Sequence, residues 1–564
     1  PIPTPTPPSY SLGEEEVFWI SDQPNNRYFT TTAVLKYVTP HLYVWLEKGY
    51  RVDERALREA ADRFDNEIYP RNRALFGSER SPGIDNDPRI HIFNGHVPGV
   101  GGYYSSADEY PRAVNPYSNE KEIFYINLDV VKPGSGFYES ILAHEFQHMI
   151  HWNVDRNEDT WVNEGLSQLA EYINRLPGNG SKEAFAHNPD TQLTSWPDEP
   201  KDALPNYGAS FLFMAYFLER FGEESLRKLV ASPANGVTAF NEILAPMGLS
   251  FEDVFADWLI ANYLDEPSLA DGRYGYREID PFPPAIERQY RHYPITREST
   301  VHQYGADYIE LRGQKPLTIR FSGSPTVTLA PVRPHSGQFM WWSNRGDEGD
   351  STLTKAFDLR GVDKATLQVW MWYDIEEHYD YAYIEVSTDG GKTWQLLRGL
   401  YTTPRNPNGN NLGWGYTGIS GKPELLQKDR AKWVREIVNL SPYAGQEVLL
   451  RFEYITDDAV SHPGLFIDDI SIPEIGYYED FESGYGGWEP HGFIYTDGVL
   501  PQKWIVQVIE LGHPPRVRRM EIGPDCRGEM EVQLGAEVPK AVLVISAYAP
   551  ATSELARYTY TITP

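Results

Sequence analysis

The segment HEFQH at residues 144–148 constrains this chain more than any other stretch of its sequence. Residues four apart lie on one face of an α-helix, so His144 and His148 can converge on one metal ion. Glu145 is displaced around the helix by one residue, close enough to hold a water molecule beside that ion. Apolar residues recur at helical intervals around the motif, which predicts a buried helix. Such a helix needs a reason to desolvate two histidines and a carboxylate, and a metal ion supplies one.

A catalytic zinc ion takes three protein ligands and keeps a fourth position for water. One common extension of H-E-x-x-H requires a glycine at position 151 and a histidine at position 154, where this chain has His151 and Val154. His151 lies on a similar helix face to His144 but two turns further along the axis, too far away to share the ion. We therefore predict that His151 either supports a ligand or lies at the surface.

Glu164 is the better candidate for the third ligand. It lies in the first turn of a second predicted helix, which Asp159 or Thr160 can cap. The separation from His148 leaves room for the end of one helix, a connecting loop and a return. Competing carboxylates occur in the predicted solvated loop, at Asp155, Glu158 and Asp159.

The two predicted helices together resemble a known family of peptidases. The stretches HEFQHMIHW and TWVNEGLSQLAEY are similar to the gluzincin zinc metallopeptidases, and most similar to the secreted bacterial neutral peptidases of the hyicolysin type. The resemblance implies that His144, His148 and Glu164 bind zinc and that Glu145 is the general base. It also gives Tyr207, at the start of a later predicted helix, the position of an oxyanion-binding tyrosine; a tyrosine at the edge of a core would look the same. Neither a second histidine motif nor a G-x-M-E-N motif is present, which favours an endopeptidase over an aminopeptidase.

The order of predicted helices and strands indicates a multidomain chain. A Pro/Thr-rich linker at residues 1–12 precedes an α+β zincin catalytic domain at residues 13–295. Within that domain the stretch GVGGYYSSADEY, residues 99–110, suits either a substrate-side edge strand or a mobile loop. The remaining sequence alternates apolar and polar residues between turn signals and is predicted to be all-β. We divide it into a small β unit, a jelly-roll domain and a C-terminal β-sandwich, at residues 296–336, 337–475 and 476–564.

The predicted jelly roll resembles the MAM-like module of immune-inhibitor-A-type secreted metallopeptidases. The similar stretches are WWSNRGDEGDSTLTKAFDL, DYAYIEVSTDGGKTWQLL, VLLRFEYITDDA and GLFIDDISI. The resemblance implies calcium ligands at Asp380, Asp468 and Asp469, because clustered carboxylates suit hard cations. Solvated acids at strand ends would give the same pattern.

Charge and cysteine content limit the classes of partner. With 50 Lys and Arg against 80 Asp and Glu, the net charge of −30 argues against nucleic acid as a partner. The single cysteine, Cys526, forms no intrachain disulfide and is either a packing residue or a thiol that masks the zinc. No apolar run is long enough to predict a transmembrane segment. The proline-rich start fits a secreted or cell-surface protein.

These observations predict a secreted zinc-dependent endopeptidase that cleaves extracellular proteins, with protein or peptide substrates. Two alternatives stay open. The first is a non-catalytic protein that binds glycans or cell-surface proteins through its β domains and whose peptidase domain has degenerated. The second is a peptidase directed to glycoproteins by those domains. The intact set of His144, Glu145, His148 and Glu164 speaks against degeneration.

Overall fold

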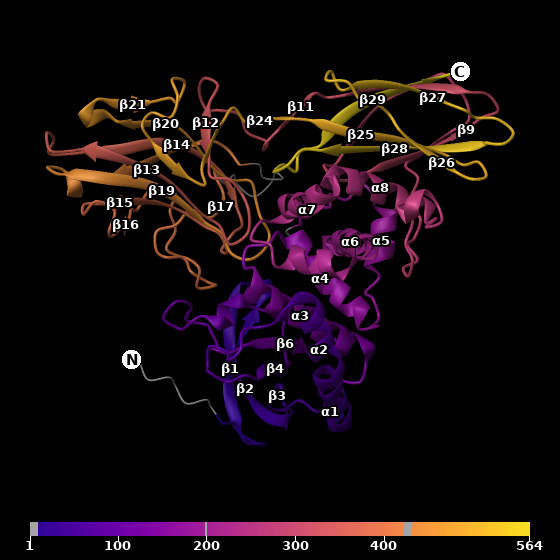
Figure 1. The fold of residues 1–564 in the computed structure, drawn as a ribbon. Helices are drawn as coiled ribbons and strands as arrows, with labels where there is room; N and C mark the ends of the chain where they lie inside the picture. The colour runs from indigo at the N-terminus through magenta and orange to yellow at the C-terminus, as the bar shows by residue number, and fades with distance from the viewer. Residues whose placement is uncertain (1–8, 198–199, 422–430) are drawn as a thin grey trace.

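The computed structural model describes residues 9–197, 200–421 and 431–564. An α/β unit comes first, a layer of helices follows, and two β-sandwiches complete the chain (Figure 1). This order, α/β and then all-β, is the multidomain arrangement that the sequence predicted. Residues 1–8 of the predicted linker lie outside the described residues. Among the described helices, none combines the length and the apolar character needed to cross a bilayer.

A six-stranded sheet with strand order β1-β2-β3-β4-β6-β5 forms the first unit. Strands β3, β4 and β6 pair in parallel, whereas β5 lies antiparallel at the edge next to β6. The parallel strands are buried on both faces, so they read as nearly continuous apolar runs. The bounds are β1 Glu15–Asp22, β2 Arg27–Val38, β3 Leu42–Glu47, β4 Ile90–Gly95, β5 Gly102–Tyr104 and β6 Ile123–Asn127.

Helices cover one face of this sheet and continue into a helical layer (Figure 1). The motif helix α3 begins after Ser135, whose side chain accepts a hydrogen bond from the Tyr138 amide. Helix α3 is buried around most of its circumference, because it packs against both the sheet and α4. The bounds are α1 Glu54–Arg63, α2 Tyr69–Phe76, α3 Gly136–Val154, α4 Thr160–Ile173, α5 Ser181–His187, α6 Leu204–Val230, α7 Gly236–Leu244 and α8 Phe251–Leu264.

The first sandwich packs a seven-stranded sheet on a five-stranded sheet around one apolar core. The seven-stranded sheet has the order β17-β14-β20-β12-β23, with β18 on β14 and β21 on β20; the other sheet has the order β16-β15-β19-β13-β22. The bounds are β12 Met340–Trp342, β13 Asp350–Asp358, β14 Thr366–Ile375, β15 Tyr381–Ser387, β16 Gln395–Leu396, β17 Gly418–Ile419, β18 Val434–Asn439, β19 Glu447–Ile455, β20 Gly464–Ile472, β21 Tyr477–Glu479, β22 Glu489–His491 and β23 Ile494–Thr496.

The second sandwich is built from two separate parts of the chain. One sheet has the order β27-β10-β29-β8 and the other β26-β25-β28-β9-β7, and the two-stranded pair β11–β24 lies where the chain leaves and re-enters this sandwich. The first sandwich is thus an insertion between β11 and β24. The bounds are β7 Arg288–Tyr290, β8 Ile295–Val301, β9 Asp307–Arg312, β10 Leu317–Gly323, β11 Thr326–Thr328, β24 Val499–Pro501, β25 Lys503–Glu510, β26 Arg516–Arg519, β27 Arg527–Val532, β28 Lys540–Tyr548 and β29 Ala556–Thr563.

These pairings differ from the predicted division of the β region. The strands predicted as a small unit at 296–336 pair with strands from the C-terminal segment. Strands β21 to β23, which we placed in the C-terminal domain, instead pair with β20, β13 and β12. The physical reason is that an alternating pattern identifies a strand and its buried face, but carries no mark of a partner far away in the sequence.

The second sandwich rests on the helical layer (Figure 1). Along β25, Ile505 and Ile509 join the core shared with the helices, while Val506 and Val508 face the interior of the sandwich. Between them, Gln507 Nε2 donates a hydrogen bond of 2.9 Å to the Ala256 carbonyl of α8. The sheet that contains β25 is therefore buried on both faces and joins the sandwich to the helical layer. Cys526 packs in the interior of the same sandwich, as the packing interpretation expects.

Candidate metal centre

Helices α3 and α4 bring the three predicted zinc ligands together. His144 and His148 lie one turn apart on α3, with ring centroids 4.8 Å apart. The Glu164 Oε2 atom, from the second turn of α4, lies 3.2 Å from His144 Nε2 and 3.6 Å from His148 Nε2. This oxygen is buried, and no described residue donates a hydrogen bond to it. Two imidazole nitrogens around an unsatisfied carboxylate oxygen suit a zinc ion.

The other ring nitrogens of the two histidines are held from α4. His144 Nδ1 lies 2.9 Å from Glu171 Oε1, and His148 Nδ1 lies 3.1 Å from Asn163 Oδ1. Both oxygens are acceptors, so each Nδ1 donates, and each Nε2 is left facing Glu164. The sequence analysis missed Glu171 and Asn163. The available signal for Glu171 was its place two turns beyond Glu164 on one face of α4.

The charges in this cluster are strongly coupled. Burial alone would raise the pKa of Glu164, but the facing His148 and His144 hold it well below its usual range. Burial alone would lower the pKa of His144, but hydrogen bonds to Glu164 and Glu171 raise it well above the ordinary value. The carboxylates therefore favour positive charge between the helices. A bound cation would take the place of the protons on the Nε2 atoms.

Glu145 lies between α3 and the edge strand β5. Its side chain is buried, and burial raises its pKa; the charges of His144 and His148 oppose this rise, the charge of Glu164 adds to it, and the Tyr104 backbone partly offsets it. Gly102 allows the close approach, because a Cβ there would lie 2.5 Å from Ile141 Cγ2 and 2.7 Å from the Tyr125 carbonyl oxygen. The stretch at 99–110 thus contributes an ordered edge strand beside the motif helix.

Tyr207 faces the same cluster from the first turn of α6. Its ring centroid lies 6.3 Å from that of His144, and its ring packs edge-on against Trp196. Burial and the charge of Glu164 raise the pKa of Tyr207 well above its ordinary value, so its hydroxyl remains a hydrogen-bond donor at neutral pH. The residue combines a packing contact with a donor beside the predicted ligands.

The competing acids of the α3–α4 loop lie apart from Glu164. Asp155 and Glu158 group with His151 instead. Glu158 is buried rather than solvated, and burial raises its pKa well above the ordinary value. His151 is buried too, with Nδ1 3.1 Å from Asn163 Oδ1, so the surface alternative for this residue is wrong.

The three predicted calcium ligands do not meet in one place. Asp380 is buried and accepts a hydrogen bond of 2.9 Å from the Asp457 amide. Asp468 and Asp469 lie elsewhere on the first sandwich and are bonded by protein donors: the Ser336 amide donates to Asp468, and the Ser336 hydroxyl donates to Asp469. A calcium site shared by all three is therefore excluded by the geometry, and calcium at any one of them stays a prediction.

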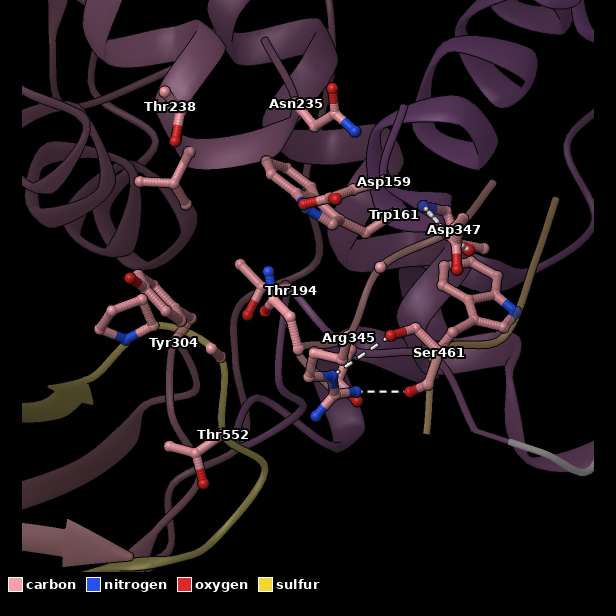
Figure 2. A pocket seen from close by; sticks show the side chains of 18 of the residues that line it. Asp159, Trp161, Thr194, Asn235, Thr238, Tyr304, Arg345, Asp347, Ser461 and Thr552 are labelled. Atoms are coloured by element: carbon pink, nitrogen blue, oxygen red, sulfur yellow. Dashed lines mark hydrogen bonds between the residues drawn. The ribbon is translucent and has the colours of Figure 1, made fainter. Parts of the chain in front are cut away.

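Helix α4 begins where the catalytic region meets the first sandwich (Figure 2). The Asp347 side chain, from the β12–β13 connection, accepts hydrogen bonds from the Thr160 amide at 3.1 Å and hydroxyl at 2.6 Å. Asp159, one of the two residues expected to cap this helix, is at the cap position but makes no side-chain capping hydrogen bond, and Thr160 is the first helical residue. A cavity of about 540 Å³ opens beside this contact, between Trp161, Tyr304 and Arg345, and contains no predicted zinc ligand. A residue of the sandwich therefore caps the helix that carries Glu164.

Several known bacterial proteins are similar in sequence to parts of this chain. It is 31% identical over 176 residues to the pre-pro-metalloprotease PrtV of Vibrio cholerae, which covers 31% of this chain and 17% of that protein. It is 26% identical over 256 residues to the neutral metalloprotease ShpI of Staphylococcus hyicus, and this match covers 40% of this chain and 56% of that protein. It is 29% identical over 196 residues to immune inhibitor A of Bacillus thuringiensis, and this match covers 34% of this chain and 26% of that protein.

The matched segments thus span between 17% and 56% of these relatives. Residues 302–498 match the family model described as "Immune inhibitor A-like, MAM domain". This range extends beyond the predicted module at 337–475 in both directions, and it includes the strands β21 to β23 that complete the first sandwich. The chain is a relative of bacterial metalloproteases and contains an immune-inhibitor-A-like MAM domain.

Proposed function

We propose that this chain is a secreted zinc-dependent endopeptidase of the gluzincin type that hydrolyses peptide bonds of extracellular proteins. The observation that carries the proposal is the convergence of His144, His148 and Glu164, with Glu145 directly after His144 on α3. Zinc bound there lowers the pKa of water toward about 7 and polarises a carbonyl group. The similarity to named metalloproteases supports this activity.

The residues of the proposed site have different roles in hydrolysis. The Glu145 carboxylate accepts the proton of the attacking water and delivers it to the leaving amine. Its buried position raises its pKa, which strengthens it as a base. The Tyr207 hydroxyl donates a hydrogen bond to the oxygen on which negative charge develops. Glu171 and Asn163 keep the two imidazoles in the orientation that ligation requires.

The edge strand β5 gives the substrate a place to bind. It ends the strand order of the six-stranded sheet and runs directly beside α3. An extended peptide can add to such an edge through main-chain hydrogen bonds, which select for backbone shape rather than for one side chain. This places the scissile bond near Glu145 and makes an unfolded or loop segment the preferred substrate.

The Glu145→Gln variant tests the proposal. We expect it to retain its zinc, because Glu145 is not a ligand, and to lose about 10²- to 10⁴-fold in casein hydrolysis. Zinc content by mass spectrometry and cleavage rate are measured on the same preparation. Glu183→Gln, at an exposed position of α5, is the matched control and should keep full activity. If zinc-loaded wild-type protein cleaves no protein substrate, the non-catalytic binding alternative replaces the proposal.

A further inference from the structure

A second group of potential metal ligands lies behind the first, in the loop that joins α3 to α4. One ligand atom from each of His151, Asp155 and Glu158 lies within 4.8 Å of the other two. His151 is in the last turn of α3, Asp155 ends that helix, and Glu158 lies just before α4. None of the three belongs to the proposed catalytic site.

The polar atoms of this group lack the partners that buried atoms normally have. His151 is 1% exposed and Glu158 is 3% exposed. Three of their atoms are buried without a hydrogen bond in the described structure: His151 Nε2, Asp155 Oδ2 and Glu158 Oε2. An unsatisfied buried polar atom is unfavourable, so three together call for a missing partner.

The surrounding backbone holds the acidic ligand in place. Glu158 Oε1 accepts hydrogen bonds of 2.7 Å from its neighbour's amide, at Asp159, and from the Gly236 amide at the start of α7. These bonds fix the carboxylate through one oxygen and leave the other oxygen free. His151 is fixed in the same way, because Asn163 Oδ1 accepts from Nδ1 and leaves Nε2 available. Ligands held through their other atoms are typical of built metal sites.

We propose that His151, Asp155 and Glu158 form a second site for a divalent transition-metal ion, with zinc as the principal occupant. One imidazole and two carboxylates make a mixed nitrogen and oxygen set that suits zinc, whereas calcium prefers six to eight oxygen ligands. Asp155 is only half-buried and gives the ion a path from solvent. Its three ligands are distinct from those of the proposed catalytic site.

The two sites share one amide group. Asn163 Oδ1 lies 3.1 Å from His151 Nδ1 and 3.1 Å from His148 Nδ1. An ion on His151 fixes that imidazole, and through Asn163 it restrains the ring of His148. The second ion therefore fastens the α3–α4 loop and positions a ligand of the first site.

Metal stoichiometry of the full chain tests the proposal. Wild-type protein, loaded with zinc and desalted, should contain two zinc ions per chain, and Asp155→Asn and Glu158→Gln should each contain one. Glu164→Gln should also contain one, and adding Asp155→Asn to it should remove that ion. Asp363→Asn, at an exposed position of the first sandwich, is the matched control and should keep both ions.

A second measurement is independent of zinc retention during desalting. Cobalt(II) added to Glu164→Gln should give visible absorption, and adding Asp155→Asn to this variant should abolish it. Zinc should raise the midpoint of thermal unfolding of Glu164→Gln but not that of the double variant. The proposal is overturned if Glu164→Gln binds no zinc and no cobalt, or if calcium alone binds in a manner that depends on Asp155. If the catalytic assignment fails instead, wild-type protein holds one zinc ion that depends on Asp155 and not on Glu164.

Discussion

Glu171 and Asn163 determine which nitrogen of His144 and of His148 faces Glu164 in the proposed metal site. A histidine presents either ring nitrogen, and the hydrogen bond at one of them fixes the role of the other. Because Glu171 holds His144 through Nδ1 and Asn163 holds His148 through Nδ1, both Nε2 atoms are available to an ion beside Glu164. The two supporting residues thus prepare the site before any metal binds.

We expect Glu171→Gln to weaken zinc binding by about tenfold, since the amide keeps an acceptor for His144 but loses the charge that raises the basicity of the imidazole. Zinc affinity is measured by competition with a chromophoric chelator. Glu183→Gln removes a carboxylate from an exposed position and should leave the affinity unchanged. Equal affinities for wild type and Glu171→Gln would contradict the supporting role.

For single residues, the sequence predicts those positions that depend only on the geometry of one helix. The spacing of His144 and His148 places both on one face of any helix, and the structure has them there. The contacts of Asn163 and Glu171 depend on how α4 packs against α3, which neither helix encodes alone. Asp468 shows the same limit, because the Ser336 amide that donates to its carboxylate is far away in the sequence.

The spacing between strand β5 and helix α3 depends on a glycine. A Cβ at Gly102 would meet Ile141 on α3 and the Tyr125 carbonyl of β6 at distances shorter than ordinary contact. Because β5 is the proposed substrate-binding edge, its distance from α3 sets where a bound peptide lies relative to Glu145.

We expect Gly102→Ala to displace β5 and to lower kcat/KM by about ten- to a hundredfold, while zinc content stays that of wild type. Peptide hydrolysis and zinc content are measured together. Gly178→Ala is the matched control, because a Cβ there meets no atom within 4 Å. Unchanged kcat/KM in Gly102→Ala would show that the edge strand does not position the substrate.

The elements themselves could be predicted from the sequence, but their partners could not. The apolar, β-branched run along residues 503–510 predicts strand β25, and the breaker run at residues 133–136 predicts the start of α3. In contrast, β10 pairs with β27 and β29, which lie on the far side of the whole first sandwich in the sequence. Pairing at that distance depends on the assembled core, so we drew the domain boundaries in the wrong places.

The catalytic region and the first sandwich are coupled through Asp347. Burial raises the pKa of this residue to about 7, and the charges of Asp159 and Asp458 add to the rise, although hydrogen bonds from Thr160 oppose it. The folded protein therefore keeps a proton on Asp347 that the unfolded chain releases near its ordinary pKa of 3.8. The folded state binds more protons in this window, so its stability falls as the pH rises from about 4 to 7.

We expect Asp347→Asn to remove this part of the pH dependence, because the amide does not titrate. The midpoint of thermal unfolding, measured from pH 4 to pH 8, should fall more steeply with rising pH in wild type than in the variant. Asp363→Asn, at an exposed position, should follow the wild-type curve. Parallel curves for wild type and Asp347→Asn would mean that the carboxyl group is ionised throughout this range.

The insertion of the first sandwich between β11 and β24 affects how freely it can move. These two strands pair with each other, Thr326 opposite Pro501, so both connections leave the second sandwich side by side. A unit attached by one flexible linker can swing, whereas a unit anchored at two adjacent points cannot rotate away without breaking that pair. A nick in one connection alone would therefore leave the first sandwich attached through the other, and its proteolytic release requires two cuts.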